Sequence, residues 1–250
     1  AVIDKWKNKG WYPKDVILKK KDILEKGFLK IYEIYQSKLL DLNVCDFGDL
    51  ILHCVKIFEE NKDIAELYSK NFKYILVDEY QDTNHIQSRW LNCLTGYHDN
   101  LCCVGDDDQS IYSWRGAEIK NFLEFDKAYK NTKVIRLEEN YRSTQNILTV
   151  ASKLIENNKN RVGKNLYTNS SDGELVYLEC FRNGKDEAIG VSDRIEKLKK
   201  KYSLNNIAIL VRAIYQTREF EERFLKIGLG YRVLGGIRFY ERAEIKDAIS

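Results

Sequence analysis

The sequence predicts an α/β fold built around a parallel sheet. Between residues 74 and 155, short apolar runs alternate with longer segments whose apolar residues recur at helical spacing. Strands that alternate with helices in this way form a parallel sheet that helices cover on both faces. Acidic residues follow each of the first two apolar runs. Because ligands of such sheets bind at the carboxyl ends of the strands, these acids are candidates for a functional site.

The first 42 residues form a different region, which is rich in lysine and has a helical pattern. Apolar residues recur there at helical spacing, among them Phe28, Ile31 and Ile34. We therefore expect a helical subdomain or insertion over residues 1–42. The run from Phe47 to Phe58 continues as a helix with one apolar face.

The α/β region follows with its elements in a regular order. Short apolar runs predict strands, and amphipathic runs predict helices. In chain order we expect a strand over residues 74–77, a helix over 84–94, a strand over 101–104, a helix over 118–125, a strand over 134–137 and a helix over 144–155 that starts at Ser143. Residues 43–163 are expected to form one domain from these elements.

A second α/β unit is expected after a connecting segment. Residues 157–173 are polar and rich in Asn, Gly and Ser, which is typical of a linker, and we place the linker itself at 164–171. Residues 172–250 then begin the second unit. Its expected elements are a strand over 175–180, a helix over 185–200, a strand over 207–211, a helix over 217–227 and a strand over 231–234.

Composition narrows the class of protein. The 41 basic and 38 acidic residues give a net charge of +3, so charge alone does not indicate a nucleic-acid partner. No apolar stretch reaches the roughly 20 residues that cross a membrane, and no secretion signal is visible. The six cysteines contain no C-x-x-C pair. We therefore expect a cytoplasmic protein, not associated with membranes, with reduced and mostly buried thiols.

The segment KYILVDEYQDTN places two carboxylates directly after an apolar strand. At that edge of the sheet Asp78 can hold Mg²⁺, and Glu79 can orient or deprotonate an attacking water molecule, as phosphoryl transfer requires. An acid pair at a solvated sheet edge without a function gives the same pattern. The pair alone leaves both interpretations open.

The segment VGDDDQSIYSWRGA follows the next predicted strand, so its loop is expected beside the first acid pair. The amide of Gln109 can bind a terminal phosphate without adding charge. The rings of Tyr112 and Trp114 can stack on nucleic-acid bases, and Arg115 can contact a phosphate or stack. Burial of both rings in the core is the alternative. The flanking acids and glycines favour an exposed loop instead.

The segment RLEENYRST follows a third predicted strand and leads into a helix. Arg142 is placed to meet the negative charge that develops on a transferred phosphoryl group. Tyr141 is placed to stack on an adenine. A surface arginine near a helix start is the alternative interpretation.

Four ordered motifs resemble the UvrD/Rep/PcrA family of superfamily-one DNA helicases. The segment Asp78 to Asn84 matches the family's motif II, Gly105 to Ala117 matches motif III, and Leu137 to Ser143 matches motif IV. The segment Gly235 to Ala248 is similar to a stretch of the second motor domain. The resemblance extends over nearly the whole chain.

The resemblance implies a motor that hydrolyses ATP between two RecA-like domains while it moves 3′ to 5′ on single-stranded DNA. Residues 1–42 would then belong to the helical insertion called 1B, 43–163 to the later part of motor domain 1A, and 172–250 to the start of domain 2A. DNA with a junction of single and double strands would be the substrate. Repair or replication proteins would be partners.

The resemblance also implies a role for each candidate residue. Asp78 and Glu79 would serve the Mg²⁺ ion, with Glu79 as the catalytic base. Gln109 would sense the γ-phosphate of ATP and couple it to the DNA. The remaining implied roles are stacking on bases by Tyr112 and Trp114 with support from Arg115, contact with the γ-phosphate by Arg142, and contact with the adenine by Tyr141.

Several features of the family do not occur in these residues, namely its Walker A loop and its motifs Ia, V and VI. The sequence contains no G-x-x-x-x-G-K-[ST] loop, whose backbone N–H groups and lysine bind phosphates. We therefore expect that this chain alone does not hydrolyse ATP. The alternatives that remain are the helicase part of a recombination helicase–nuclease and a non-enzymatic remnant or partner-binding module.

Overall fold

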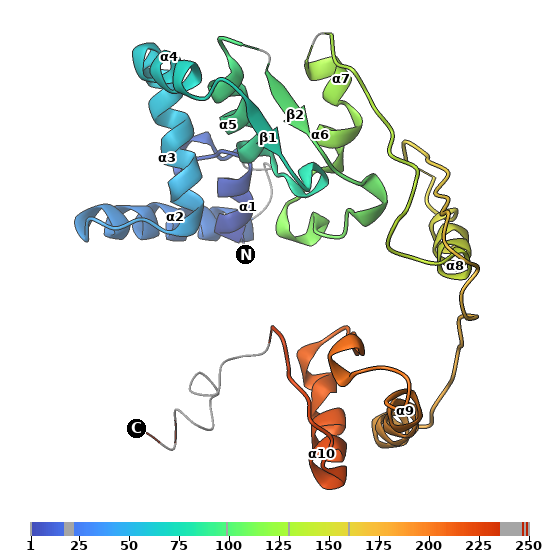
Figure 1. Ribbon diagram of the computed structural model, residues 1–250. Coiled ribbons are helices and arrows are strands. Elements are labelled where there is room, and N and C mark those ends of the chain that lie inside the picture. The colour runs from blue at the N-terminus through green and yellow to red at the C-terminus, as the bar shows by residue number, and fades with distance from the viewer. Residues whose placement is uncertain are drawn as a thin grey trace. The chain divides into compact units, whose positions relative to one another are not determined.

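The computed structural model describes residues 2–17, 23–98, 100–129, 131–159, 161–235, 247 and 249 (Figure 1). It consists of two compact units, Ala1–Leu175 and Val176–Ser250. The larger unit contains a small parallel sheet and most of the helices. The segment that resembles the second motor domain, residues 235–248, lies mostly outside the described residues.

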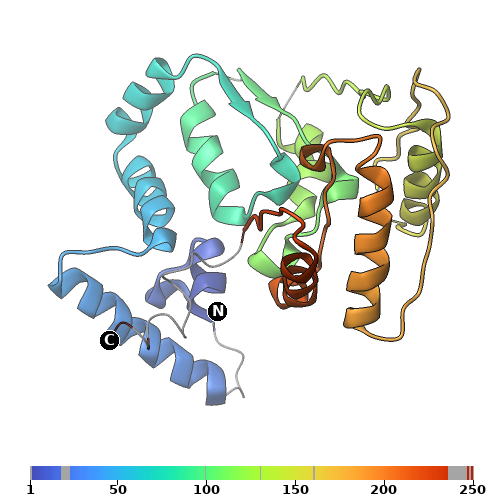
Figure 2. The same ribbon diagram turned by 60° about the horizontal axis from the view of Figure 1, so that its bottom comes forward.

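The N-terminal region is helical, as the sequence predicts. Helix α1 covers Val2–Asn8, the short helix η1 covers Pro13–Asp15, and α2 covers Ile23–Asp41. Helix α2 lies alongside α1 (Figure 2), and Trp6 of α1 stacks on Tyr32 of α2 with 5.8 Å between ring centroids. These contacts attach the two helices to each other.

A buried ion pair attaches α1 to the next helix. The Nζ atom of Lys7 lies 2.7 Å from Asp46 Oδ2 and 2.8 Å from Asp49 Oδ1, and the side chains of Lys7 and Asp49 have no exposed surface. Asp46 and Asp49 also form the capping box of α3, Phe47–Glu60. A charge this deeply buried requires such a partner, because an unpaired charge in the interior is very costly.

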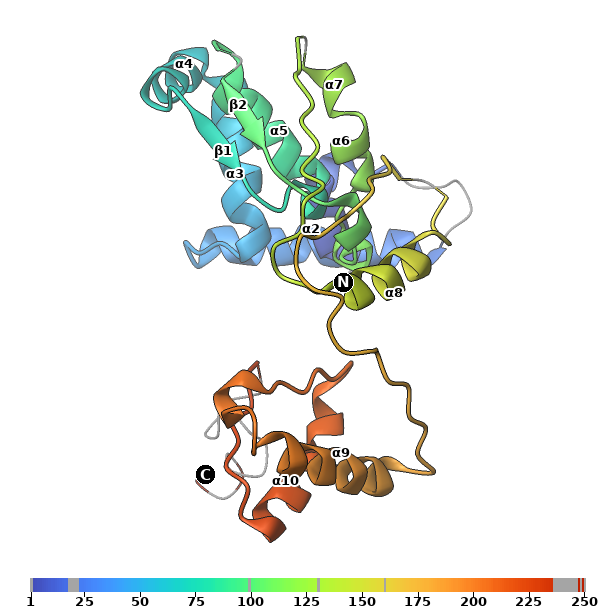
Figure 3. The same ribbon diagram turned by 45° about the vertical axis from the view of Figure 1, so that its right-hand side comes forward.

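Three helices pack together beside the sheet. Helix α3 is followed by α4, Lys62–Asn71, which the sequence analysis did not anticipate, and α5, His85–Thr95, begins at the cap residue Asn84. Leu52 and Val55 of α3 pack with Ile86 of α5 in one buried cluster. Figure 3 shows α3 and α5 behind the strands.

The sheet contains the first two strands that the sequence predicts. Strand β1, Ile75–Val77, pairs in parallel with β2, Leu101–Cys103, and Leu76 lies opposite Cys102. The ladder continues past both strands, because Val104 N–H donates to Val77 O at 2.8 Å. The carboxyl ends of β1 and β2 therefore lie next to each other, and the loops that follow them start from the same edge.

Short helical turns and helices follow these strands. The turn η2 covers Tyr80–Asp82 after β1, and η3, Asp107–Gln109, and η4, Ser113–Arg115, come after β2. The helix expected at 118–125 is divided into α6, Ile119–Leu123, and α7, Phe125–Ala128. Helix α8, Gln145–Ile155, confirms the expected helix, although its N-cap is Thr144 rather than Ser143.

The other four predicted strands do not form, and that part of the prediction is wrong. Residues 134–137, 175–180, 207–211 and 231–234 belong to no strand. A strand needs a neighbour to accept and donate its backbone hydrogen bonds. Among the described residues these runs have no such neighbour, and the nearest approach to a third strand is one parallel bridge between Glu139 and Tyr167.

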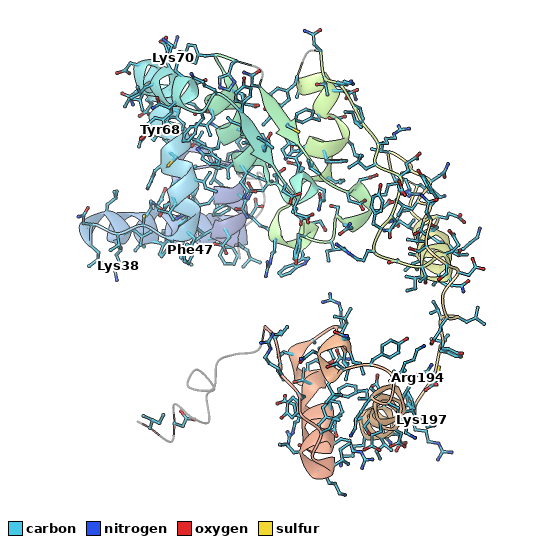
Figure 4. The ribbon with its side chains drawn as sticks, in the orientation of Figure 1. Lys38, Phe47, Tyr68, Lys70, Arg194 and Lys197 are labelled. Carbon is cyan, nitrogen blue, oxygen red and sulfur yellow. The ribbon has the colours of Figure 1, made fainter. Side chains whose placement is uncertain are left out.

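The part of the smaller unit up to residue 235 contains two α-helices. Helix α9 covers Gly184–Leu198 and α10 covers Thr217–Ile227, which confirms both expected helices, and the short turns η5 (Leu204–Asn206) and η6 (Ile214–Gln216) lie between them. The buried apolar cluster of this unit comes from both helices and from the residues after α10; its members are Ala188, Ile195, Phe220, Phe224 and Leu229. Figure 4 labels Arg194 on α9, whose guanidinium lies 4.5 Å from the ring of Tyr177.

The structure tests two expectations from composition, the lack of a membrane-spanning segment and the state of the cysteines. None of the helices that the structure describes is long and apolar enough to cross a membrane. All six cysteines are free thiols. The expectation that they are mostly buried is wrong, because four are exposed. Cys102 is one of them, since alternate residues of β2 point to opposite faces and its face is uncovered.

Candidate functional site

The two acids after β1 lie exposed at the carboxyl end of that strand. Asp78 Oδ1 accepts a hydrogen bond of 2.9 Å from the backbone N–H of Glu79. Glu79 has a left-handed backbone, with φ of 51° and ψ of 40°. Such a conformation is uncommon for a residue other than glycine and is found preferentially at functional sites. Both carboxylates therefore lie exposed at the sheet edge, on either side of the point where the backbone becomes left-handed.

Gln81 connects this pair to the loop after β2. Its side chain is only 1% exposed, and its Nε2 donates to Glu79 Oε2 at 2.6 Å. Its Oε1 accepts from the backbone N–H of Asp106 at 3.0 Å. Buried amides are costly unless they are hydrogen-bonded, and here both ends of the amide have a partner.

Gly105 allows this close approach of the two loops. A Cβ atom at this position would lie 2.6 Å from Gln81 Oε1 and 2.8 Å from the ring of Phe122. Both distances are far below van der Waals contact, so no larger residue fits without movement of its neighbours. Gly105 therefore has a packing role.

Asp106 organises the acidic loop that follows. Its side chain caps η3 by accepting from the backbone N–H of Asp108 at 3.0 Å, and its Oδ2 accepts from Gln109 Nε2 at 2.8 Å. Burial opposes ionisation of Asp106, but hydrogen bonds from Lys164 and Gln109 outweigh it and hold its pKa below the ordinary value. Asp106 is therefore a stably ionised acceptor between the two glutamines.

A basic segment far along the chain neutralises the acidic loop. Arg161 donates two hydrogen bonds to Asp108, of 2.9 Å from Nε and 2.6 Å from Nη2. Lys164 forms an ion pair with Asp106, and the backbone N–H of Val162 donates to Asp107 at 2.7 Å. The carboxylates of Asp106, Asp107 and Asp108 are the one trio in the described residues close enough to share a metal ion. Their bonds to Arg161 and Lys164 indicate a structural ion-pair cluster instead.

Two aromatic rings and a guanidinium lie close together after η3, and the planes of the two rings are tilted by 47°. The ring centroids of Tyr112 and Trp114 are 6.3 Å apart, and Arg115 Cζ lies 5.1 Å from the first and 4.8 Å from the second. Trp114 is 68% exposed. Asn8 holds the end of this turn, since its Nδ2 donates to Arg115 O at 3.1 Å. The loop therefore presents Trp114 and Arg115 to solvent, and Tyr112 lies half-buried beside them.

Tyr141 and Arg142 lie on an exposed turn before α8. Asn140 Oδ1 accepts from the backbone N–H groups of Arg142 at 3.0 Å and Ser143 at 2.8 Å, which stabilises the turn. The hydroxyl of Tyr141 donates to Glu139 at 2.7 Å, and this bond raises its pKa. Within the described ranges, no hydrogen bond or ion pair joins Arg142 to Asp78, Glu79 or Gln109.

The structure thus gathers some of the predicted site residues and leaves others apart. A chain of hydrogen bonds links Glu79 to Gln109 through Gln81 and Asp106. Tyr112, Trp114 and Arg115 come from the same loop as Gln109 and form their own cluster.

Comparison with known proteins places this geometry in a family. Residues 1–130 match the model of the UvrD/REP helicase N-terminal domain, and residues 135–250 match that of the UvrD-like helicase C-terminal domain. The chain belongs to the UvrD/REP helicase family. The two matches cover both compact units, so the membership does not depend on the motifs alone.

Several bacterial helicases are similar to this UvrD-type chain. It is 46% identical to DNA helicase II of Rickettsia typhi over the whole of the chain and 38% of the relative. It is 46% identical to the ATP-dependent DNA helicase PcrA of Bacillus subtilis over 88% of the chain and 30% of the relative. It is 44% identical to DNA helicase II of Escherichia coli over 91% of the chain and 32% of the relative. The chain therefore spans less than half the length of these relatives.

Sequence reasoning missed four residues of this UvrD-type site. Gln81 stands two positions after Glu79, but no spacing rule indicates that its amide turns back to that carboxylate. Asp106 looked like one of three equivalent acids. Arg161 and Lys164 lie in the segment expected to be a linker or its border, and only the fold brings them to the acids.

Proposed function

We propose that this chain is part of an ATP-dependent DNA helicase, which couples ATP hydrolysis to 3′-to-5′ movement on single-stranded DNA and to duplex unwinding in repair or replication. Family membership supports the proposal. The observation that carries it is the hydrogen-bonded link between Glu79 and Gln109, because the loop of Gln109 also carries the rings of Tyr112 and Trp114. The residue proposed to sense the phosphate and the rings proposed to contact DNA thus lie on the same loop.

The proposed architecture is a RecA-like motor domain followed by the start of a second one. In this proposal residues 1–42 belong to a helical insertion, 43–163 to the first motor domain, 164–171 to a linker and 172–250 to the second motor domain. The parallel pair of β1 and β2 supports it, since RecA-like domains have parallel sheets.

The strand-end acids suit a Mg²⁺ ion that accompanies ATP. Asp78 is exposed, and its Oδ2 has no hydrogen bond or ion pair with any residue that the structure describes. Carboxylate oxygen is the ligand that Mg²⁺ prefers. We assign Asp78, with Glu79 beside it, to this ion. When bound, Mg²⁺ neutralises charge on the phosphates.

Glu79 is the proposed general base. One of its oxygens, Oε2, is held by Gln81, so the other is left to accept a proton from the attacking water molecule. The amide of Gln109 binds the γ-phosphate as an uncharged donor, and the guanidinium of Arg142 offsets charge on that phosphate. The ring of Tyr141, which is 82% exposed, is available to stack on the adenine.

The rings of Tyr112 and Trp114 form the proposed DNA contact. Exposed aromatic rings offer flat faces to bases of any sequence, and each stack contributes roughly 1–3 kcal/mol. Arg115, which lies against both rings, keeps them in place and adds positive charge for a phosphate. Single strands and their junctions with duplex are therefore the proposed substrates, and the proposed location is the cytoplasm.

The 250 residues alone are proposed not to hydrolyse ATP. Their sequence contains no phosphate-binding loop of the form G-x-x-x-x-G-K-[ST]. Without its backbone N–H groups and lysine, the triphosphate is not anchored in front of Asp78 and Glu79.

A comparison of the whole helicase with this chain tests the proposal. We expect DNA-stimulated ATP turnover and 3′-to-5′ unwinding from the whole protein, and neither from the 250 residues. Turnover by the chain alone, or a whole protein that binds single strands without any ATP turnover, contradicts the proposal.

A further inference from the structure

Gln81 occupies a position that a purely structural residue does not need. It lies in η2, between the acid pair and α5, and its side chain is 1% exposed. An apolar side chain of similar length would fill the same space without the cost of burying an amide. Instead, the amide of Gln81 donates a hydrogen bond to Glu79 and accepts one from the backbone of Asp106, so it contacts both loops of the site. We infer that Gln81 is a positioning residue that links the catalytic base to the phosphate-sensing loop.

The first half of the link restrains Glu79. Gln81 Nε2 donates to Glu79 Oε2 at 2.6 Å, although Glu79 itself is exposed. An exposed glutamate otherwise samples several rotamers. Because one oxygen is held by a buried donor, the direction of the carboxylate is fixed relative to β1. The other oxygen, Oε1, has no hydrogen bond to any residue in the described ranges.

The second half of the link reaches Gln109. Gln81 Oε1 accepts from the backbone N–H of Asp106 at 3.0 Å, and Asp106 Oδ2 accepts from Gln109 Nε2 at 2.8 Å. The ion pair with Lys164 keeps Asp106 in this position. Glu79, Gln81, Asp106 and Gln109 thus form one continuous hydrogen-bonded chain between the ends of β1 and β2.

This chain gives a physical route for coupling. A displacement of Gln109 on binding a phosphate pulls on Asp106 and, through Gln81, on the carboxylate of Glu79. The inference rests on the proposed function, since it assigns Glu79 and Gln109 the roles given there. The hydrogen-bonded link through Gln81 can itself be tested without ATP.

The structural test measures hydrogen exchange at the Asp106 amide by NMR on this chain. We expect Gln81→Met to speed exchange there by about tenfold or more, because the acceptor is lost. Gln36→Met is the matched control, since Gln36 is also buried and donates to a carboxylate, Asp49, outside the site. Unchanged exchange at Asp106 in Gln81→Met overturns the link, as does an equal change in Gln36→Met.

The functional test uses the whole helicase. We expect Gln81→Met to lower kcat for ATP between about 10-fold and about 100-fold, with KM within about twofold, because the base is misdirected while ATP binding is intact. Gln36→Met should leave both values unchanged. A kcat for Gln81→Met equal to that of the control overturns the positioning role. If the unsubstituted protein itself has no ATP turnover, the proposed function has failed, and the exchange result still decides the link.

Discussion

Gly105 is the residue whose size is most tightly limited at the site. An added Cβ atom would lie 2.6 Å from Gln81 Oε1 and 2.8 Å from the ring of Phe122. We predict that Gly105→Ala lowers the free energy of unfolding by roughly 1–3 kcal/mol, because buried neighbours must shift. Urea denaturation of the chain measures the change.

Gly27 provides the matched control for this substitution. It lies in α2, and an added Cβ atom there meets no atom within 4 Å. Gly27→Ala should raise the free energy of unfolding by about 0.5–1 kcal/mol, since alanine favours the helix. A Gly105→Ala chain as stable as the unsubstituted one contradicts the packing role of Gly105.

Asp106 makes stability depend on pH in acid. Burial opposes its ionisation, but the hydrogen bonds from Lys164 and Gln109 outweigh it and lower its pKa in the folded state. The stabilisation is therefore complete above the unfolded pKa of about 4 and is lost as the pH falls through the lower folded value. We predict that Asp106→Asn reduces the loss of stability below about pH 4. Urea denaturation at a series of pH values gives the two slopes, and equal slopes would count against this role.

The loop of η3 and η4 is the element that joins the two proposed activities. Trp114 is 68% exposed and lies against Arg115. We predict that Trp114→Ala weakens the binding of single-stranded DNA by the whole helicase about 10-fold, because one stacking surface of roughly 1–3 kcal/mol is lost. Fluorescence anisotropy with a labelled oligonucleotide measures the affinity.

Tyr74 is a suitable control for Trp114. Its ring is 76% exposed, but it precedes β1 and so lies at the amino end of that strand. Tyr74→Ala should leave the DNA affinity unchanged. Equal losses for the two substitutions would show that exposed rings bind DNA without regard to the loop.

Most of the long helices follow from local sequence and could be predicted, although α4 was missed and the helix expected over 118–125 is divided into α6 and α7. Asn84 and Asp46 each cap a helix through contacts within three residues, and apolar spacing marks the buried face. Strands β1 and β2 were also predicted correctly, since their two apolar runs pair with each other within the described chain. The run over residues 134–137 has the same composition but no neighbour there, and composition does not reveal whether a neighbour exists.

The site was predictable only in part, for a similar reason. Asp78, Glu79 and Gln109 follow strands, and the position of a strand end is a local property. The link through Gln81 and the ion pairs of Arg161 depend on contacts between distant segments. The spacing of residues along the sequence does not indicate such contacts.

Several apolar side chains of the described residues are exposed in this chain, which is shorter than the related helicases. Leu76, Ile135 and Leu137 are 77%, 68% and 78% exposed, and Figure 4 places the 91% exposed Phe47 at the start of α3. The chain spans 38% of the length of the Rickettsia typhi relative. We propose that further parts of the helicase cover these surfaces.

Hydrogen exchange over residues 134–137 tests this view of the whole molecule. In the whole helicase we predict that these amides exchange at least about tenfold more slowly than in the 250-residue chain, because a covered backbone is protected from solvent. Residues 185–198 of α9 serve as the reference, since that helix bonds internally in both. Equal exchange over 134–137 in the two proteins contradicts the proposed coverage of these residues.

The central claim is that Glu79 acts as the base for ATP hydrolysis, and ATP turnover of the whole helicase with Glu79→Gln tests it most directly. The account predicts that kcat falls by about 100-fold to 10,000-fold while DNA binding is retained, since glutamine keeps the shape and loses the basicity. Glu66→Gln, which removes an exposed ion pair with Lys70 on α4, should leave kcat unchanged. A Glu79→Gln helicase that turns over ATP at the rate of the Glu66→Gln control would contradict the account.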